Sequence, residues 1–213
     1  MRLRNIANAR KMLERHPELV ILDPARHKGC WKKMFGNDNP IFLEIGMGKG
    51  QFICGISEKM GDANFLGLEK YDSVMFRALQ RLLLNPRQNA LLLRGEAENL
   101  LEYFASGEIE RVYLNFSDPW PRKGNIKRRL TYMEFLDKYK IILASGGEIH
   151  LKTDNRAFFE FTLQHMNEYG VRFILINLDL RAEEPEDNVR TEYEESRSAV
   201  GAVIYQVICK FVD

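Results

Sequence analysis

The sequence has few cysteines and no long apolar segment. Cys30, Cys54 and Cys209 are odd in number and far apart, and none belongs to a Cys-x-x-Cys pair. Such a set offers no disulfide framework, so we expect free thiols, a reducing compartment and no bound metal. No apolar run approaches the roughly 20 residues that span a bilayer, and none of signal-peptide length follows the first residues. We therefore expect a cytoplasmic protein that is not inserted in a membrane.

The chain also lacks a strong net charge, because 31 Lys and Arg face 30 Asp and Glu in 213 residues. This balance hides an asymmetry. Residues 1–33 carry nine Lys and Arg against three acids, whereas residues 183–195 carry seven acids against one Arg. A local basic region attracts polyanions whatever the total charge, so the balance does not exclude a nucleic-acid partner. The length suits one buried core, and we expect a basic N-terminal arm (1–39) followed by a single domain (40–213).

Short apolar runs alternate with helix-like stretches from residue 40 onward. The runs cover 41–45, 64–68, 90–93, 111–116, 148–152, 172–178 and 202–211, and the helices about 50–60, 71–84, 131–144 and 156–168. This alternation predicts an α/β fold with a parallel sheet and helices on both of its faces. The last two runs have no clear helix between them, which favours antiparallel pairing there. Residues 181–198 are strongly polar, and we expect a long loop.

A glycine-rich turn, Gly46-Met47-Gly48-Lys49-Gly50, follows the first apolar run. Such a turn between a strand and a helix lets a ligand approach the backbone closely, although it can also be a tight turn without a ligand. Glu69 lies 19 residues after Gly50, at the end of the second run, where an acid commonly binds a ribose diol. Glu96 follows the third run and suits an adenine amino group, the alternative being a helix cap. The pattern predicts a cofactor that contains a ribose.

Glu44 distinguishes between two such cofactors. It precedes the glycines, where a carboxylate repels a pyrophosphate and attracts a ligand that carries an ammonium and a sulfonium. The third glycine also comes one position too early for the dinucleotide pattern G-x-G-x-x-G. The sequence therefore favours S-adenosylmethionine over a nicotinamide dinucleotide.

The fourth run leads directly into Asp118, Pro119 and Trp120. Proline stiffens this turn, and the aromatic ring offers a stacking surface for a base. Five basic residues follow within eight positions, with no acid among them: Arg122, Lys123, Lys127, Arg128 and Arg129. The combination predicts an enzyme that acts on a base within a nucleic acid. The structural alternatives are core packing for Trp120 and a solvated face for the basic residues.

From about residue 40 to 210 the chain resembles the bacterial tRNA (guanine-N7)-methyltransferases. The resemblance is carried by Glu44 to Gly50, by Asn115 to Trp120 with the trailing Lys127-Arg128-Arg129, by Lys152-Thr153-Asp154-Asn155 and by Thr191-Glu192-Tyr193-Glu194. It implies a Rossmann-like class I methyltransferase fold, with a seven-stranded, mostly parallel sheet whose last strand is antiparallel. It also implies methyl transfer from S-adenosylmethionine to N7 of the variable-loop guanosine of tRNA. The oligomeric state stays open, a homodimer being one option.

The resemblance also implies roles for individual residues. Glu44, Glu69, Glu96 and Asp118 would line the S-adenosylmethionine site with Gly46, Gly48 and Gly50, and Asp118 would be catalytic. Arg122, Asp154, Thr191, Glu192, Tyr193 and Glu194 would contact the substrate, and the residues themselves add Trp120, Lys123, Lys127, Arg128 and Arg129. The family usually has Lys where this chain has Arg122. The substitution keeps the positive charge but replaces a compact ammonium with a planar guanidinium that has several N–H donors.

Two other functions fit parts of the pattern. An Asp-Pro-aromatic turn also suits methylation of an exocyclic amine in DNA or RNA, where the carboxylate accepts the amino protons. A non-catalytic RNA-binding protein on a Rossmann-like scaffold is the second alternative. Carboxylates at three successive strand ends argue against it, because they are unfavourable in an RNA groove without a cationic ligand.

Overall fold

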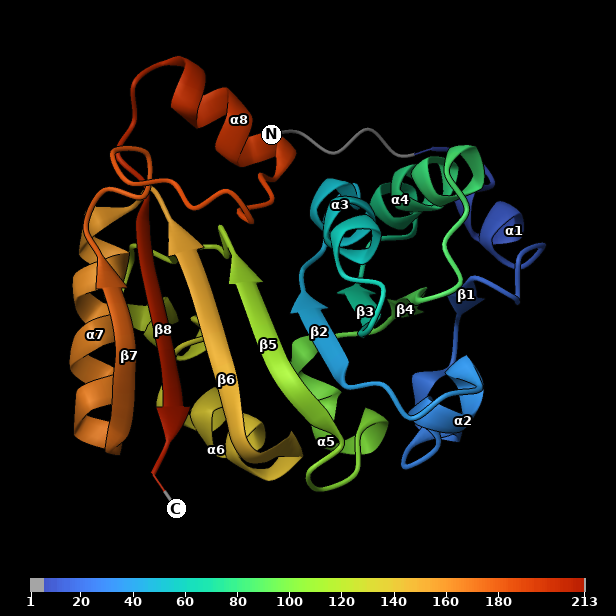
Figure 1. Cartoon of the computed structure of the whole chain (residues 1–213), viewed down its shortest axis with the longest axis horizontal. Coiled ribbons are helices and arrows are strands. Elements are labelled where there is room, and N and C mark those ends of the chain that lie inside the picture. Colours follow the sequence, from blue (N-terminus) through green and yellow to red (C-terminus); the bar gives the residue numbers. More distant parts are fainter. Residues whose placement is uncertain (1–5, 213) are drawn as a thin grey trace. The chain divides into compact units, whose positions relative to one another are not determined.

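The computed structural model describes residues 6–212, so Arg2 and Arg4 of the expected basic arm lie outside the described part. The chain divides into two compact units, residues 1–105 and 106–213, each with its own strands and helices (Figure 1). Within residues 6–212, every helix is too short or too polar to cross a bilayer.

The first unit contains four parallel strands in the order β1-β4-β3-β2. They are β1 (Val20–Ile21), β2 (Ile41–Ile45), β3 (Asn64–Glu69) and β4 (Ala90–Arg94). Every residue of β2 and β3 is buried, which explains why these strands are mostly apolar and show no regular alternation of apolar and polar residues. Helices α3 (Gln51–Lys59) and α4 (Asp72–Leu84) pack together against β3 and β4, and α1 (Ala9–Leu13) packs on α4.

The described part of the N-terminal segment is folded onto this unit. It contains α1, β1, the 3-10 helix η1 (Pro24–His27) and α2 (Trp31–Phe35). Trp31 is fully buried, and its indole N–H donates to the carbonyl of Tyr103 at 3.0 Å. Tyr103 ends α5 (Leu100–Tyr103), which follows the 3-10 helix η2 (Ala97–Asn99). The division into an arm and a single domain at residue 40 stays a prediction.

The second unit contains β5 (Ile109–Asn115), β6 (Leu143–Thr153), β7 (Val171–Asn177) and β8 (Tyr205–Phe211), in the order β5-β6-β8-β7. β5 and β6 are parallel, and β8 runs antiparallel to both of its neighbours. Helices α6 (Met133–Ile142) and α7 (Arg156–Tyr169) pack against these strands (Figure 1). The 3-10 helix η3 (Lys123–Arg128) follows β5 after a loop. The expected antiparallel last strand is confirmed.

All seven expected strands are present, and the described residues add β1 as a short eighth. The expected loop over 181–198 is wrong at its end, because Glu192–Ala199 form helix α8. Thr191 begins this helix with a capping box: its hydroxyl accepts from the Glu194 N–H at 2.9 Å, and the Glu194 carboxylate accepts from the Thr191 N–H. A capping box and acids in the first turn favour a helix even where the sequence has few apolar residues.

Candidate functional site

The glycine turn is built by backbone conformation. Gly46, Gly48 and Gly50 all have φ between 58° and 78°, a region that other residues rarely adopt. A Cβ at Gly50 would lie 2.6 Å from the Cβ of Ala78, so this glycine permits the close packing of α3 on α4. At Gly46 and Gly48 a Cβ would meet no atom within 4 Å. These two glycines therefore leave open space beside the turn, as close approach of a ligand requires.

Glu69 holds this turn in place. Its Oε2 accepts from the Gly48 N–H at 3.2 Å, and its Oε1 accepts from the N–H groups of Lys70 and Tyr71 at 2.9 and 3.0 Å. The side chain is largely buried, and burial raises the pKa of Glu69 although these hydrogen bonds oppose the shift. A carboxylate offers about four acceptor positions, so about one remains on Oε2.

Two further acids lie at the same edge of the first unit. Glu44 is the penultimate residue of β2 and is buried, and Glu96 follows β4. Because β2, β3 and β4 are parallel neighbours, Glu44, Glu69 and Glu96 lie at or near their carboxyl ends, at the same edge of the sheet. Glu96 precedes η2, is exposed and makes no side-chain capping bond. The structure thus gathers the three predicted cofactor acids, and their roles stay predictions.

The loop after β5 has an unusual backbone. Phe116 and Trp120 have φ of 53° and 40°, in the left-handed region that non-glycine residues seldom adopt. The Phe116 N–H donates to the carbonyl of Lys152 at 2.8 Å, which ties the start of the loop to β6. Asp118 is exposed between these two strained positions. Strained backbone of this kind is concentrated at functional sites, which is consistent with a functional role for Asp118.

The basic residues after this loop differ in their contacts. Arg122, Lys123 and Lys127 are exposed, and Lys127 Nζ lies 3.9 Å from a carboxylate oxygen of Glu134. The guanidinium of Arg128 lies 4.2 Å from the centre of the half-buried Trp120 ring. Arg129 is half-buried and turns toward the loop, where it donates to the carbonyls of Pro119 and Trp120. The run is therefore a solvated basic surface up to Arg128, and Arg129 belongs to the packing beneath the loop.

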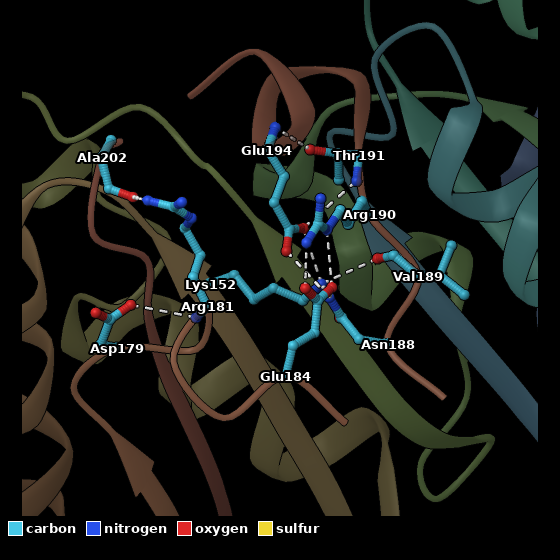
Figure 2. A network of polar contacts seen from close by, with 10 residues as sticks. All are labelled: Lys152, Asp179, Arg181, Glu184, Asn188, Val189, Arg190, Thr191, Glu194 and Ala202. Atoms are coloured by element: carbon cyan, nitrogen blue, oxygen red, sulfur yellow. Dashed lines mark hydrogen bonds and ion pairs between the residues drawn. The ribbon is translucent and has the colours of Figure 1, made fainter. Parts of the chain in front are cut away.

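Lys152, at the end of β6, is the centre of a buried polar network (Figure 2). Its Nζ donates to Glu194 Oε2 at 3.0 Å, to Asn188 Oδ1 at 2.7 Å and to the carbonyl of Val189 at 3.0 Å. The Lys152 and Glu194 side chains are only 7% and 2% exposed. The Glu194 carboxylate is thus engaged inside the protein, where it joins α8 to β6.

The segment before α8 is held by the same network. Asn188 donates to Glu184 at 2.6 Å and to Glu194 at 3.2 Å, and Arg190 forms an ion pair with Glu184 (Figure 2). Hydrogen bonds from Arg190 lower the pKa of Glu184 to about 2. Residues 184–194 therefore fold back on the end of β6 and place α8 there.

Asp154 lies two residues after Lys152 and contacts α8 directly. It accepts from Arg197 Nε at 2.6 Å and from the Tyr193 hydroxyl at 3.3 Å. The Tyr193 ring is exposed, and its centre lies 5.1 Å from that of Phe116. Burial and the nearby Asp154 raise the pKa of Tyr193. Asp154, Tyr193 and the start of the Asp118 loop are thus brought together, and Glu192 is exposed on the first turn of α8.

The sequence reading did not identify Lys152, Asn188 or Arg197 as parts of this region. Lys152 lay in a motif that carried the resemblance, but its partners are 36 to 42 residues away, and the sequence pattern carries no signal for such pairings. The capping box at Thr191 and Glu194 could have been found, since Thr-x-x-Glu is its usual signature. Within residues 6–212, no three or more His, Cys, Asp or Glu side chains gather in a way that could hold a metal ion.

Comparison with known proteins agrees with these features. A family model described as "Putative methyltransferase" matches residues 38–207. The tRNA (guanine-N(7)-)-methyltransferase of an Exiguobacterium species is 49% identical over 99% of this chain and 98% of its own length. The protein of the same name from a Geobacillus species is 48% identical over 99% of this chain and 96% of its own length.

Among solved structures, the 16S rRNA methyltransferase KamB superposes with a TM-score of 0.66 over 86% of this chain and 93% of its own, at 13% sequence identity. At that identity the likeness shows the fold alone, a Rossmann-like class I methyltransferase fold. The identity of 48–49% to the two curated enzymes extends over almost the whole chain and shows the family: this chain belongs to the bacterial tRNA (guanine-N7)-methyltransferase family.

Proposed function

We propose that the protein transfers a methyl group from S-adenosylmethionine to N7 of the variable-loop guanosine of tRNA, in the cytoplasm. The observation that carries this function is a sequence identity of 48–49% over almost the whole chain to relatives named tRNA (guanine-N(7)-)-methyltransferase. The structure adds a glycine turn with three acids at neighbouring strand ends and a strained loop that presents Asp118 beside a basic surface.

The first unit suits the proposed cofactor. Gly46 and Gly48 leave space beside the turn, and Glu69 retains an acceptor position on Oε2 for one ribose hydroxyl. The buried carboxylate of Glu44 favours a ligand that carries positive charge. When bound, S-adenosylmethionine supplies an electrophilic methyl group on a sulfonium. Glu96 is the proposed partner of the adenine amino group.

Guanine N7 has an in-plane lone pair and no proton, so the reaction needs no general base. Catalysis consists mainly of alignment of N7 with the methyl carbon and the sulfur. Positive charge develops on the guanine ring as the bond forms, and a fixed carboxylate stabilises it. We assign this role to Asp118, which can also accept hydrogen bonds from guanine N1–H and N2–H and so select guanine over adenine.

The second unit suits the nucleic acid. The exposed Arg122, Lys123, Lys127 and Arg128 provide phosphate contacts, and the ring of Trp120 provides a surface on which a base can stack. An A-form helix hides N7 in a deep and narrow groove, so a guanosine in a loop is the accessible target. We assign direct contact with the substrate to Asp154, Glu192 and Tyr193, and an indirect role through the position of α8 to Thr191 and Glu194.

The test is transfer of label from methyl-labelled S-adenosylmethionine to an unmodified tRNA transcript. A matched transcript carries adenosine in place of the variable-loop guanosine. We expect one methyl group per molecule of the first transcript and background transfer to the second. Equal labelling of both transcripts would refute the proposed target.

A further inference from the structure

Arg129 is distinguished from the other basic residues by its contacts. Its Nε donates to the carbonyl of Pro119 at 2.8 Å, and its Nη2 donates to the carbonyl of Trp120 at 3.2 Å. The same guanidinium lies 4.1 Å from the centre of the Phe161 ring and 5.9 Å from that of Phe158, both on α7. Two of its five N–H donors and its contact with the Phe161 ring are thus used within the protein.

The segment that carries Arg129 is itself anchored. The carbonyl of Leu130 accepts from the Tyr139 hydroxyl of α6 at 3.0 Å. The hydroxyls of Thr131 and Thr162 are 3.0 Å apart, and both threonines are fully buried, the second on α7. The two residues after Arg129 are therefore held by α6 and α7. The guanidinium of Arg129 connects this anchored segment to the loop through its two hydrogen bonds.

The loop requires such an anchor. Left-handed φ at Phe116 and Trp120 costs free energy that the surroundings must offset, or the loop relaxes. The two carbonyls that Arg129 binds belong to the two residues directly after Asp118. Their hydrogen bonds hold the peptide planes on the C-terminal side of that carboxylate.

We propose that Arg129 is a positioning residue that fixes the Asp118-Pro119-Trp120 turn through its main-chain carbonyls, and that it does not bind tRNA phosphate. Its importance for turnover rests on the proposed role of Asp118. The planar guanidinium of Arg129 donates to two carbonyls while it lies over the Phe161 ring, and the ammonium of a lysine cannot make these contacts together. The two neighbouring arginines thus differ in role. Arg129 binds loop carbonyls, whereas Arg128 lies over the Trp120 ring and is exposed to solvent.

The first test compares Arg129→Lys and Arg129→Ala with the control Arg128→Ala. Arg129→Lys keeps the charge, yet kcat at saturating tRNA should fall by about 10- to 100-fold, because a misplacement of about 1 Å can cost that much. Neither Arg129 variant should change the salt dependence of tRNA binding. Arg128→Ala should lower the slope of log affinity against log salt by about 0.7 to 0.9. A phosphate contact at Arg129 predicts the reverse: Arg129→Lys keeps kcat, and Arg129→Ala lowers the slope.

The second test does not depend on turnover. The chain has two tryptophans, and Trp31 is fully buried, so fluorescence that acrylamide quenches comes from Trp120. Arg129→Lys should increase the quenching of Trp120 while the protein still melts cooperatively. Wild-type quenching together with wild-type kcat in this variant would overturn the proposal. Normal turnover in Asp118→Ala would instead refute the proposed catalytic residue, and the quenching result would still decide whether Arg129 fixes the loop.

Discussion

The ammonium of Lys152 and the carboxylate of Glu194 form an ion pair at 3.0 Å that is almost entirely removed from solvent. The pair joins the end of β6 to α8, and the same lysine accepts the Phe116 N–H through its own carbonyl. Lys152 therefore links both α8 and the start of the Asp118 loop to the end of β6. The position of residues 191–194 therefore depends on the ion pair between Lys152 and Glu194.

Loss of one partner of this pair should destabilise the protein strongly. Lys152→Met leaves Glu194 buried without its cation, and the expected loss is about 3–5 kcal/mol in the free energy of unfolding. Urea denaturation measures it. A double variant, Lys152→Met with Glu194→Met, should recover much of the loss because no buried charge remains unpaired. Arg156→Ala, which breaks the exposed Arg156–Glu160 pair, should change little. Wild-type stability in Lys152→Met would contradict the anchoring role.

Asp118 should matter for turnover and little for stability, because its side chain is exposed. We expect Asp118→Ala to lower the methylation rate by roughly 10²- to 10³-fold, the cost of losing one preorganised group that stabilises developing charge. Single-turnover kinetics at saturating tRNA measures the chemical step, and thermal melting checks the fold. A variant that melts normally and methylates at the wild-type rate would remove Asp118 from the chemistry.

Glu69 should make cofactor affinity depend on pH. Burial raises its pKa above the usual 4.5, and the ionised form is the better acceptor for a ribose hydroxyl and the better partner for a cation. Affinity should therefore be highest well above the raised pKa and should fall as the pH is lowered toward it. This loss should begin at a higher pH than for a solvent-exposed glutamate.

Calorimetry with S-adenosylmethionine across about pH 5 to 8 measures this dependence. Glu69→Gln should bind more weakly and with a flatter pH profile, because it cannot ionise. Glu69→Ala should lose about 1.5–3 kcal/mol, the range for a hydrogen bond to a charged group, and more if the Gly48 turn loosens. An unchanged affinity in Glu69→Ala would place the ribose elsewhere.

The exposed basic residues should govern the salt dependence of tRNA binding. Because Arg129 is held inside the loop, the double variant Lys127→Ala with Arg128→Ala is the appropriate test of phosphate contacts. Its slope of log affinity against log salt should decrease by about 1.4 to 1.8, two phosphates at about 0.7 to 0.9 each. S-adenosylmethionine affinity should stay within about a factor of two. An unaltered slope would mean that tRNA phosphates are bound by other residues.

The sequence predicted β2, β3 and β4 well because they are almost continuously buried. The predicted bounds of β2 match the observed ones, because a short, mostly apolar run that ends at a glycine-rich turn is typical of a buried parallel strand. The carboxylates at strand ends followed from the same pattern, because parallel strands bring their carboxyl ends to one edge. Strand β1, with only two residues, carries too little signal to be recognised.

The sequence failed where long-range contacts decide the outcome. Arg129 looked like its basic neighbours, and only the fold shows that Phe161 and two loop carbonyls surround it. Helix α8 was missed because it has almost no apolar face, and its stability comes from the Thr191 cap and from Lys152 beneath Glu194. Polar residues that appear solvated in a sequence can thus be structural once a distant partner removes them from water.

The identity of the methylated nucleoside is the most direct test of the proposed reaction. Unmodified tRNA is incubated with the protein and S-adenosylmethionine, digested to nucleosides and analysed by mass spectrometry against standards. We expect 7-methylguanosine as the product, located in the variable loop by cleavage at the modified base. Methylation of an exocyclic amine of adenosine, cytidine or guanosine, or the absence of any methylated nucleoside, would contradict it.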